Sequence, residues 1–197
     1  VGEGAQHNVM VYGLGAPGYE MAETVAMNLT GSNVQFTGAD LSTKLKLMGV
    51  DVASFGDYER PPDQATPLVY EDPLGGVYKK LLFDHAGERL LGGILVGDAT
   101  DYGTLSVLAK SGEPLRCAPG ELIGGAGGAA AALGGAEAMP DDAQICSCNN
   151  VSKKDLCTAI AGGELTTLHE RQACTKAGTG CGGGMPLVPA IHKQGRA

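Results

Sequence analysis

The apolar positions near the start of the chain predict a short strand followed by a helix. The run 9–14 is apolar enough for a strand, Pro17 suits a first helical turn, and Gly31 is placed to end the helix. The apolar residues that share one helical face are Met21, Ala22, Val25, Ala26 and Leu29. Residues 1–31 are therefore expected to fold as a loop, a strand and a helix.

The next segment has the composition of an antiparallel meander. A short element is expected over residues 41–47, and strands over 50–55, 68–70, 77–83 and 90–96. The run Asp84-His85-Ala86-Gly87 supplies turn residues between the last two strands. A helix is predicted over Thr100–Lys110, with Thr100 as its N-cap and Gly112 just beyond its end.

The pattern changes again after residue 112. Alanine and glycine dominate from Gly124 to Ala138, so residues 113–143 are predicted to form a flexible linker. Capping-box spacings then predict two short helices, at Ser152 with Asp155 and at Thr167 with Glu170, and Pro186 is placed to open a third. A unit this small buries little apolar surface and usually needs a staple such as a metal.

The net charge of −8 is unevenly distributed. From Gln144 onward six Lys and Arg residues oppose three Asp and Glu residues, whereas the preceding residues carry a net −11. An acidic body argues against nucleic-acid binding. The basic end suits an anionic cofactor and equally an ordinary solvated face.

No feature of the sequence predicts a membrane or secretory protein. No apolar run is long enough to span a bilayer, and no signal peptide is visible. Since the chain begins at Val1 without a methionine, we expect an internal fragment of a cytoplasmic protein.

Five of the six cysteines lie in roughly the final quarter of the chain, which favours metal or redox chemistry over disulfides. Cys146 and Cys148 are separated by one residue, a spacing that rarely closes a disulfide but lets both thiolates face one metal. Glycines follow Cys181 and permit close backbone approach and amide donation to sulfur. Thiolates suit iron–sulfur clusters and zinc alike, so both stay open.

The segments 144–153 and 173–183 resemble the module typified by bacterioferritin-associated ferredoxin, in the version found inside assimilatory nitrite reductase. The resemblance implies a [2Fe-2S] cluster with Cys146, Cys148 and Cys181 as ligands. That family places a fourth cysteine where this sequence has Gly184. Either the cluster is lost or weakly bound, or another group completes it.

The remaining cysteines have simpler interpretations. Cys174 is the nearest candidate for the missing ligand. Cys157, among apolar helical residues, and Cys117, near the linker, are expected to be small core residues.

The start of the chain carries a second resemblance. Gly2-Glu3, followed by residues 11–23, is similar to the second flavin-binding motif of two-dinucleotide-fold reductases. The resemblance implies that Gly2 and Glu3 meet the FAD ribitol. A helix beginning near Pro17 would direct its positive N-terminus at the flavin. The alternative for Glu3 is a solvated acid.

Residues 38–54 and 95–102 resemble the junction and the βββ-α domain of rubredoxin-reductase-like enzymes. Asp98 and Asp101 have the spacing of an acid–base pair, but helix capping is the preferred interpretation. The four scattered histidines lack the spacing of metal ligands. No catalytic residue is assigned within this chain.

These observations predict an α+β protein in four parts. Residues 1–50 would be the end of a dinucleotide-binding fold that binds FAD, and 51–112 a small βββ-α domain. Residues 113–143 would be the linker, and 144–197 a small all-helical cysteine-bearing domain.

The resemblance implies a fragment, inactive alone, of the large subunit of NAD(P)H-dependent nitrite reductase. In that family NAD(P)H reduces FAD, and a [2Fe-2S] centre relays electrons toward siroheme, where nitrite becomes ammonia. The NAD(P)H, siroheme and [4Fe-4S] sites would lie in flanking domains of the parent chain, and a small reductase subunit is an expected partner. The alternatives are a non-catalytic interaction module that has lost its cluster, and a zinc-binding domain.

Overall fold

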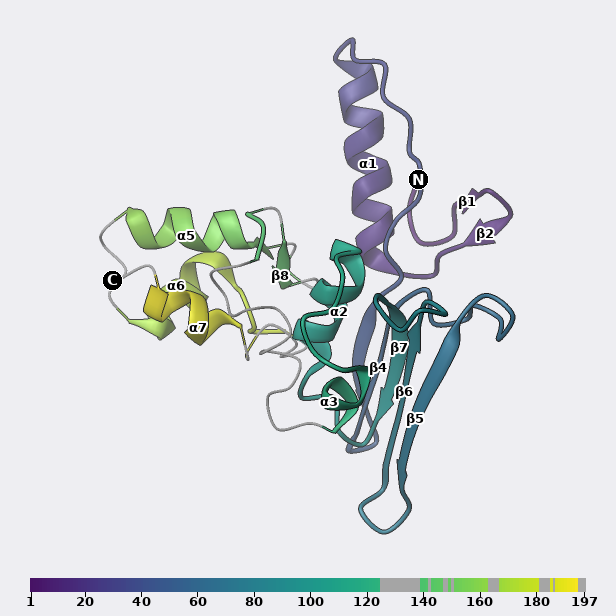
Figure 1. The fold of residues 1–197 in the computed structure, drawn as a ribbon. Helices are drawn as coiled ribbons and strands as arrows, with labels where there is room; N and C mark the ends of the chain where they lie inside the picture. The colour runs from purple at the N-terminus through teal and green to yellow at the C-terminus, as the bar shows by residue number, and fades with distance from the viewer. Residues whose placement is uncertain are drawn as a thin grey trace. The chain divides into compact units, whose positions relative to one another are not determined.

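The computed structural model describes residues 1–124, 139–141, 143–146, 149, 151–162, 167–180, 185 and 187–194 (Figure 1). The chain divides into two compact units, Val1–Leu41 and Ser42–Ala197. A largely antiparallel sheet and separate helices make the fold α+β, as predicted.

The first unit consists of a small hairpin and one long helix. Strands β1 (Gln6–His7) and β2 (Met10–Val11) pair through a turn in which Asn8 and Val9 have positive φ. Helix α1 runs over Gly15–Leu29 and buries only Pro17 and Met21. The strand expected over 9–14 is thus much shorter, because the turn consumes Val9 and Gly13 adopts φ +65° just after β2.

The apolar face predicted for α1 is mostly exposed within this unit. The side chain of Val25 is 42% exposed and that of Leu29 is 83% exposed. The periodicity of this segment correctly predicted a helix, but most of its apolar face has no cover from residues 1–41.

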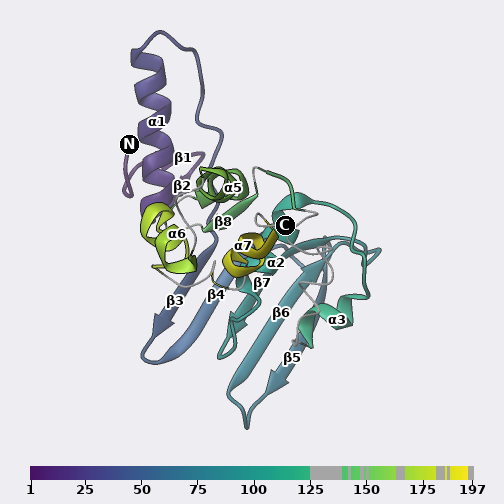
Figure 2. The ribbon, with the colours of Figure 1, turned by 90° about the vertical axis from the view of Figure 1, so that its left-hand side faces the viewer.

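The second unit contains a five-stranded antiparallel sheet in the order β3-β4-β7-β6-β5 (Figure 2). The strands are β3 (Thr43–Leu47), β4 (Val50–Gly56), β5 (Thr66–Asp72), β6 (Val77–Phe83) and β7 (Leu90–Val96). Every element expected between residues 41 and 96 is therefore a strand. The β3–β4 hairpin spans the boundary that the sequence placed at residue 50.

Two helices cover this sheet. Helix α2 (Tyr102–Ser111) packs on β4 and β7, and helix α3 (Pro119–Ile123) packs on β5 and β6. The core between them contains Phe55, whose ring meets that of Tyr102 edge-on at 6.2 Å. A Cβ at Gly93 would lie 2.8 Å from the Phe55 ring, so the close approach of that ring to β7 requires glycine.

Residues 100–123 differ from the prediction in two respects. Asp101, not Thr100, is the N-cap of α2, and the Thr100 amide donates to the Asp98 carboxylate. The range predicted as a flexible linker includes α3, whose Leu122 and Ile123 are buried in the sheet core. Its residues 125–138 lie outside the described part of the chain. Gly112 ends α2 with φ +62°, as predicted.

The cysteine-bearing segment begins with a two-stranded ladder and continues with short helices. Strands β8 (Gln144–Cys146) and β9 (Val151–Ser152) pair antiparallel, so this region is not purely helical. Helices α5 (Lys153–Ala161) and α6 (Leu168–Thr175) open with the two predicted capping boxes. Helix α7 covers Val188–Gln194, and Pro186 lies outside the described residues.

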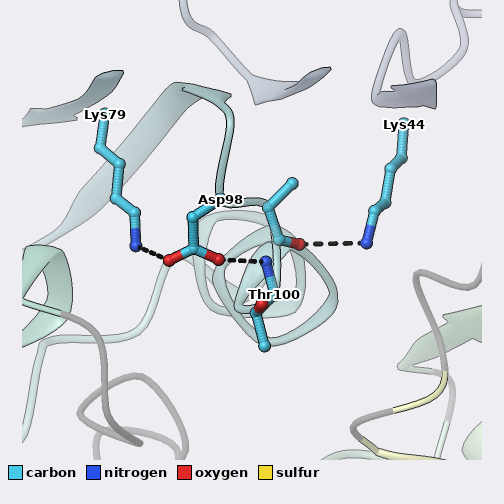
Figure 3. Close-up of polar contacts among 5 residues, drawn as sticks. Lys44, Lys79, Asp98 and Thr100 are labelled. Atoms are coloured by element: carbon cyan, nitrogen blue, oxygen red, sulfur yellow. Dashed lines mark hydrogen bonds and ion pairs between the residues drawn. The ribbon is translucent and has the colours of Figure 1, made fainter. Parts of the chain in front are cut away.

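An ion pair anchors the turn between β7 and α2 (Figure 3). Lys79, only 5% exposed, donates to Asp98 Oδ2 at 2.6 Å, while Asp98 Oδ1 accepts the Thr100 amide at 3.0 Å. The hydrogen bond from Lys79 holds the pKa of Asp98 at about 2, whereas burial raises the pKa of Asp101. On the other side Lys44 Nζ donates to the Ala99 carbonyl at 3.1 Å. The carboxylate thus ties a strand to a helix start and is not arranged for acid–base catalysis.

Removing the buried lysine's partner should destabilise the second unit more than removing the lysine. Asp98→Asn retains an acceptor for the Thr100 amide but leaves the buried Lys79 ammonium without its counter-charge. It should lower the free energy of unfolding by about 2–3 kcal/mol. Lys79→Met leaves a carboxylate that is 38% exposed and partly hydrated, and should cost about 1 kcal/mol. Urea unfolding measures both.

The exposed pair Arg60–Asp57 is the control, and Arg60→Ala should cost less than about 1 kcal/mol. Equal costs for both buried-pair variants would contradict this account.

Acid should reduce the contribution of this pair in a defined pH range. Since the Asp98 pKa falls from 3.8 to about 2 on folding, its stabilisation is complete above 3.8 and is lost as the pH falls through about 2. The difference in unfolding free energy between the unsubstituted protein and Asp98→Asn should therefore shrink across that range. A difference that is independent of pH there would show that Asp98 is not the titrating group.

Candidate metal centre

Cys146 is the predicted ligand that the structure describes, and it lies at the end of β8. The strand is held by pairing with β9, where Cys146 lies opposite Val151. Ile145 and Val151 are buried, so an apolar ladder fixes the backbone on both sides of the cysteine. Cys146 itself is 1% exposed and belongs to a core shared with Leu156, Ala177 and Ile191.

Among the residues that the structure describes, two N–H groups point at the Cys146 sulfur. The Gly178 amide donates to Sγ at 3.3 Å, and Asn149 Nδ2 donates at 3.7 Å. N–H donors to sulfur stabilise the thiolate form over the thiol and are the usual surroundings of a metal-bound cysteine. The donor set at Cys146 therefore fits a thiolate that ligates a metal.

The turn that carries Gly178 depends on two residues with positive φ. Lys176 ends α6 with φ +58°, and Gly178 follows with φ +76°. These angles bring the Gly178 amide back toward β8. The φ of +76° favours glycine at position 178, and a Cβ there would lie 2.8 Å from the sulfur of the Met185 side chain, which would have to shift.

Lys153 fixes the approach to β8 from the other side. Its side chain is buried, and its ammonium donates to the Met139 carbonyl at 2.6 Å. The backbone amides of Lys153 and Lys154 donate to the carbonyls of Ala143 and Asp141, each at 2.8 Å. The start of α5 thus holds the chain that leads into Cys146.

The structure does not test the full predicted ligand set. Cys148, Cys181 and Gly184 lie outside the described residues. Cys174 is on α6 with its side chain exposed. Among the residues that the structure describes, no three His, Cys, Asp or Glu side chains are grouped to hold a metal ion. The assignment of Cys146, Cys148 and Cys181 stays a prediction.

The other two cysteines pack against the apolar cores. Cys157 on α5 packs at the edge of the core that holds Cys146. Cys117 packs against the sheet core, and burial, followed by the nearby Glu121 charge, raises the pKa of its thiol. Both locations agree with the expectation of small core residues.

The predicted flavin residues lie together at the start of α1. The Glu3 carbonyl accepts the Gly13 amide at 3.1 Å, and a Cβ at Gly18 would lie 3.3 Å from the Gly2 Cα. Pro17 is buried in the first turn of the helix, while the Glu3 side chain is exposed. The first unit therefore places Gly2 and Glu3 beside a helix N-terminus that has no acidic residue in its first turn.

Three residues of the metal region have contacts that the sequence does not predict. Asn149 follows the C-x-C pair directly, and Gly178 lies in a turn after a capped helix. Lys153 occupies the first position of α5, where a lysine opposes the helix dipole, and this unfavourable placement was a signal of a tertiary partner.

The chain matches two families of known domains. Residues 42–113 match the rubredoxin NAD+ reductase C-terminal domain, and residues 144–191 match the BFD-like [2Fe-2S] binding domain. In the residues that the structure describes, no helix is both long and apolar enough to cross a membrane.

Curated relatives match over nearly the whole chain. It is 47% identical to the nitrite reductase [NAD(P)H] large subunit of Klebsiella oxytoca and 45% identical to the nitrite reductase (NADH) large subunit of Escherichia coli strain K12. Each match covers 97% of this chain, and 20% and 23% of those relatives respectively. The nitrite reductase [NAD(P)H] of Emericella nidulans is 42% identical, over 98% of the chain and 20% of the relative.

Over nearly its whole length the chain is similar to a segment of NAD(P)H nitrite reductase large subunits. It spans about a fifth of the length of these relatives. Within that segment lie the two matched domains, so the family resemblance found in the sequence is confirmed.

The Gly178 turn should be sensitive to substitution. Gly178→Ala places a side chain at positive φ and against the Met185 sulfur, and should cost about 1–2 kcal/mol of unfolding free energy. Displacement of its amide from Cys146 should also lower the iron bound per chain. Gly162→Ala is the matched control, because φ there is −63° and the new Cβ would meet only ordinary contacts. Thermal unfolding and iron analysis that fail to separate the two variants would contradict this role.

Proposed function

We propose that this chain is the electron-relay segment of an NAD(P)H-dependent nitrite reductase. The observation that carries the proposal is the buried Cys146 sulfur, which receives two N–H donors inside the module that matches a [2Fe-2S] binding domain. Cys146, Cys148 and Cys181 would hold the cluster. When bound, the cluster supplies reversible one-electron redox chemistry.

The residues of this chain position and shield that chemistry. The apolar core around Cys146 excludes water from one side of its sulfur, which affects the reduction potential. The Gly178 and Asn149 donors stabilise negative charge on the sulfur. The Lys153 contacts hold the entering strand in place. These are functions of orientation and potential tuning, without a catalytic side chain.

Gly184 decides how complete the ligand set is. A [2Fe-2S] cluster normally has four protein ligands, and glycine has no ligating side chain. We propose that three thiolates anchor the cluster and that Cys174 or a non-protein ligand takes the fourth position. The presence of glycine in place of a ligand cysteine at position 184 also favours a second candidate function, a partner-docking module that has lost its cluster.

The first unit fits the end of a flavin domain. Gly2 and Glu3 would meet the FAD ribitol, and the N-terminus of α1 behind Pro17 would stabilise negative charge on the reduced ring. The exposed apolar face of α1 supports this assignment, because such a helix would be covered by the rest of a dinucleotide-binding fold.

The flanking domains of the parent enzyme would supply the remaining chemistry. NAD(P)H would reduce FAD, and electrons would leave the [2Fe-2S] centre for a siroheme and [4Fe-4S] domain that reduces nitrite to ammonia. A small reductase subunit is a further expected partner. We place the enzyme in the cytoplasm, where NAD(P)H is available.

Anaerobic reconstitution with iron and sulfide tests the relay function. The chain should acquire the absorption and, once reduced, the electron paramagnetic resonance spectrum of a [2Fe-2S] cluster. Cys146→Ser should lose at least most of it, because an alcohol is a poor ligand for iron. Cys157→Ser, at the edge of the same core, is the matched control and should retain it.

The same measurement separates the alternatives. Gly184→Cys should raise cluster occupancy if the missing ligand limits binding. One zinc per chain would support a zinc domain instead. Failure of both the unsubstituted chain and Gly184→Cys to form a cluster would exclude the relay role and leave the docking module.

A further inference from the structure

The side chain of Asn149 bonds to both segments that carry the predicted ligands. Its Nδ2 donates to Cys146 Sγ at 3.7 Å and to the Lys176 carbonyl at 2.7 Å. Cys146 ends the first cysteine strand, and Lys176 opens the turn that leads toward Cys181. We propose that Asn149 is a positioning residue, which sets the separation of the two cysteine segments and tunes the cluster through the Cys146 sulfur. This inference rests on the proposed relay function.

The Lys176 carbonyl is the centre of a small polar clasp. Besides Asn149, it accepts the Thr179 amide at 3.2 Å and the Thr179 hydroxyl at 2.8 Å. Lys176 itself adopts φ +58°, so its carbonyl points out of the helix toward these donors. The turn is closed by the hydrogen bonds between Thr179 and Lys176. The side-chain amide of Asn149 binds this turn and connects it to β8.

The Gly178 amide forms a second hydrogen-bonded link between the 176–178 turn and Cys146. It comes from the same turn and donates to the same sulfur, at 3.3 Å. The sulfur and the carbonyl are thus joined by two hydrogen-bonded routes, one through Asn149 and one through residues 176–178. Loss of the Asn149 route should loosen the turn and lengthen the remaining bond to sulfur.

The chemistry requires an amide at this position. One NH₂ group carries two donors, which matches one sulfur and one carbonyl. Aspartate has the same shape but only acceptors, and it would place a negative charge beside a thiolate and a carbonyl oxygen. Alanine removes the donors to Cys146 Sγ and to the Lys176 carbonyl without adding charge. Comparison of the two substitutions separates the loss of donors from the addition of charge.

Donors to a ligand sulfur affect the reduction potential. Reduction adds negative charge to the cluster and its thiolates, so N–H donors stabilise the reduced state more than the oxidised state. Removal of the Asn149 donor should therefore lower the midpoint potential. A tenfold change in the one-electron reduction equilibrium corresponds to roughly 59 mV, and we expect a shift of this order for Asn149→Ala.

The test uses the full chain in two forms, with Gln172→Ala as the matched control. Gln172 is a nearby amide whose Nε2 donates to the Met185 sulfur. In the iron-free protein, amide hydrogen exchange of Gly178 and Thr179 should be several-fold faster in Asn149→Ala and Asn149→Asp than in the control. After reconstitution, in the unsubstituted and Gly184→Cys backgrounds, both variants should have a lower midpoint potential, with the larger shift in Asn149→Asp.

The two forms distinguish failure of this inference from failure of the relay function. Unchanged exchange in the iron-free variants, or an unchanged potential in the loaded ones, would overturn the role of Asn149. If neither background binds a cluster while exchange still responds, the relay function fails and the positional tie between the two segments is supported.

Discussion

The buried sulfur of Cys146 is the constraint around which the C-terminal segment is organised. A thiolate in an apolar core is costly unless hydrogen-bond donors or a metal stabilise its charge. Here strand pairing brings the cysteine into the core, and a turn of positive-φ residues returns an amide to its sulfur. The capping boxes fix the starts of α5 and α6, and the buried Lys153 holds the chain that leads into Cys146.

The sheet region is stabilised by different means and has a different purpose. Its core is apolar and closely packed, and Gly93 on β7 leaves room for the ring of Phe55. The buried charge of Lys79 is neutralised by Asp98. Nothing in this arrangement resembles a catalytic centre in the residues that the structure describes.

The sequence predicted many of the regular elements, because apolar runs bounded by turn residues and capping boxes are local signals. The strands at 77–83 and 90–96 and the caps at Ser152 and Thr167 are confirmed. Prediction failed where tertiary contacts decide. Asp101 rather than Thr100 is the N-cap of α2, next to the contact between Asp98 and the Thr100 amide. Helix α3 folds in the presumed linker because Leu122 and Ile123 are buried. Gly178 could not be assigned to the sulfur from local pattern, since it lies 32 residues beyond Cys146, whereas Asn149 is close to Cys146 in the sequence and only the direction of its side chain was unknown.

Pulsed electron paramagnetic resonance of the reduced, reconstituted chain can detect whether the Gly178 amide lies beside the cluster. With ¹⁵N-glycine and unlabelled remaining residues, the account predicts a [2Fe-2S] signal with a coupling to a glycine nitrogen that is lost or markedly weakened in Gly178→Ala. A cluster signal whose glycine coupling is the same in both proteins would contradict the assignment of the Gly178 amide to a ligand sulfur. A chain that yields no cluster signal, even with Gly184→Cys, would contradict the ligand role of Cys146.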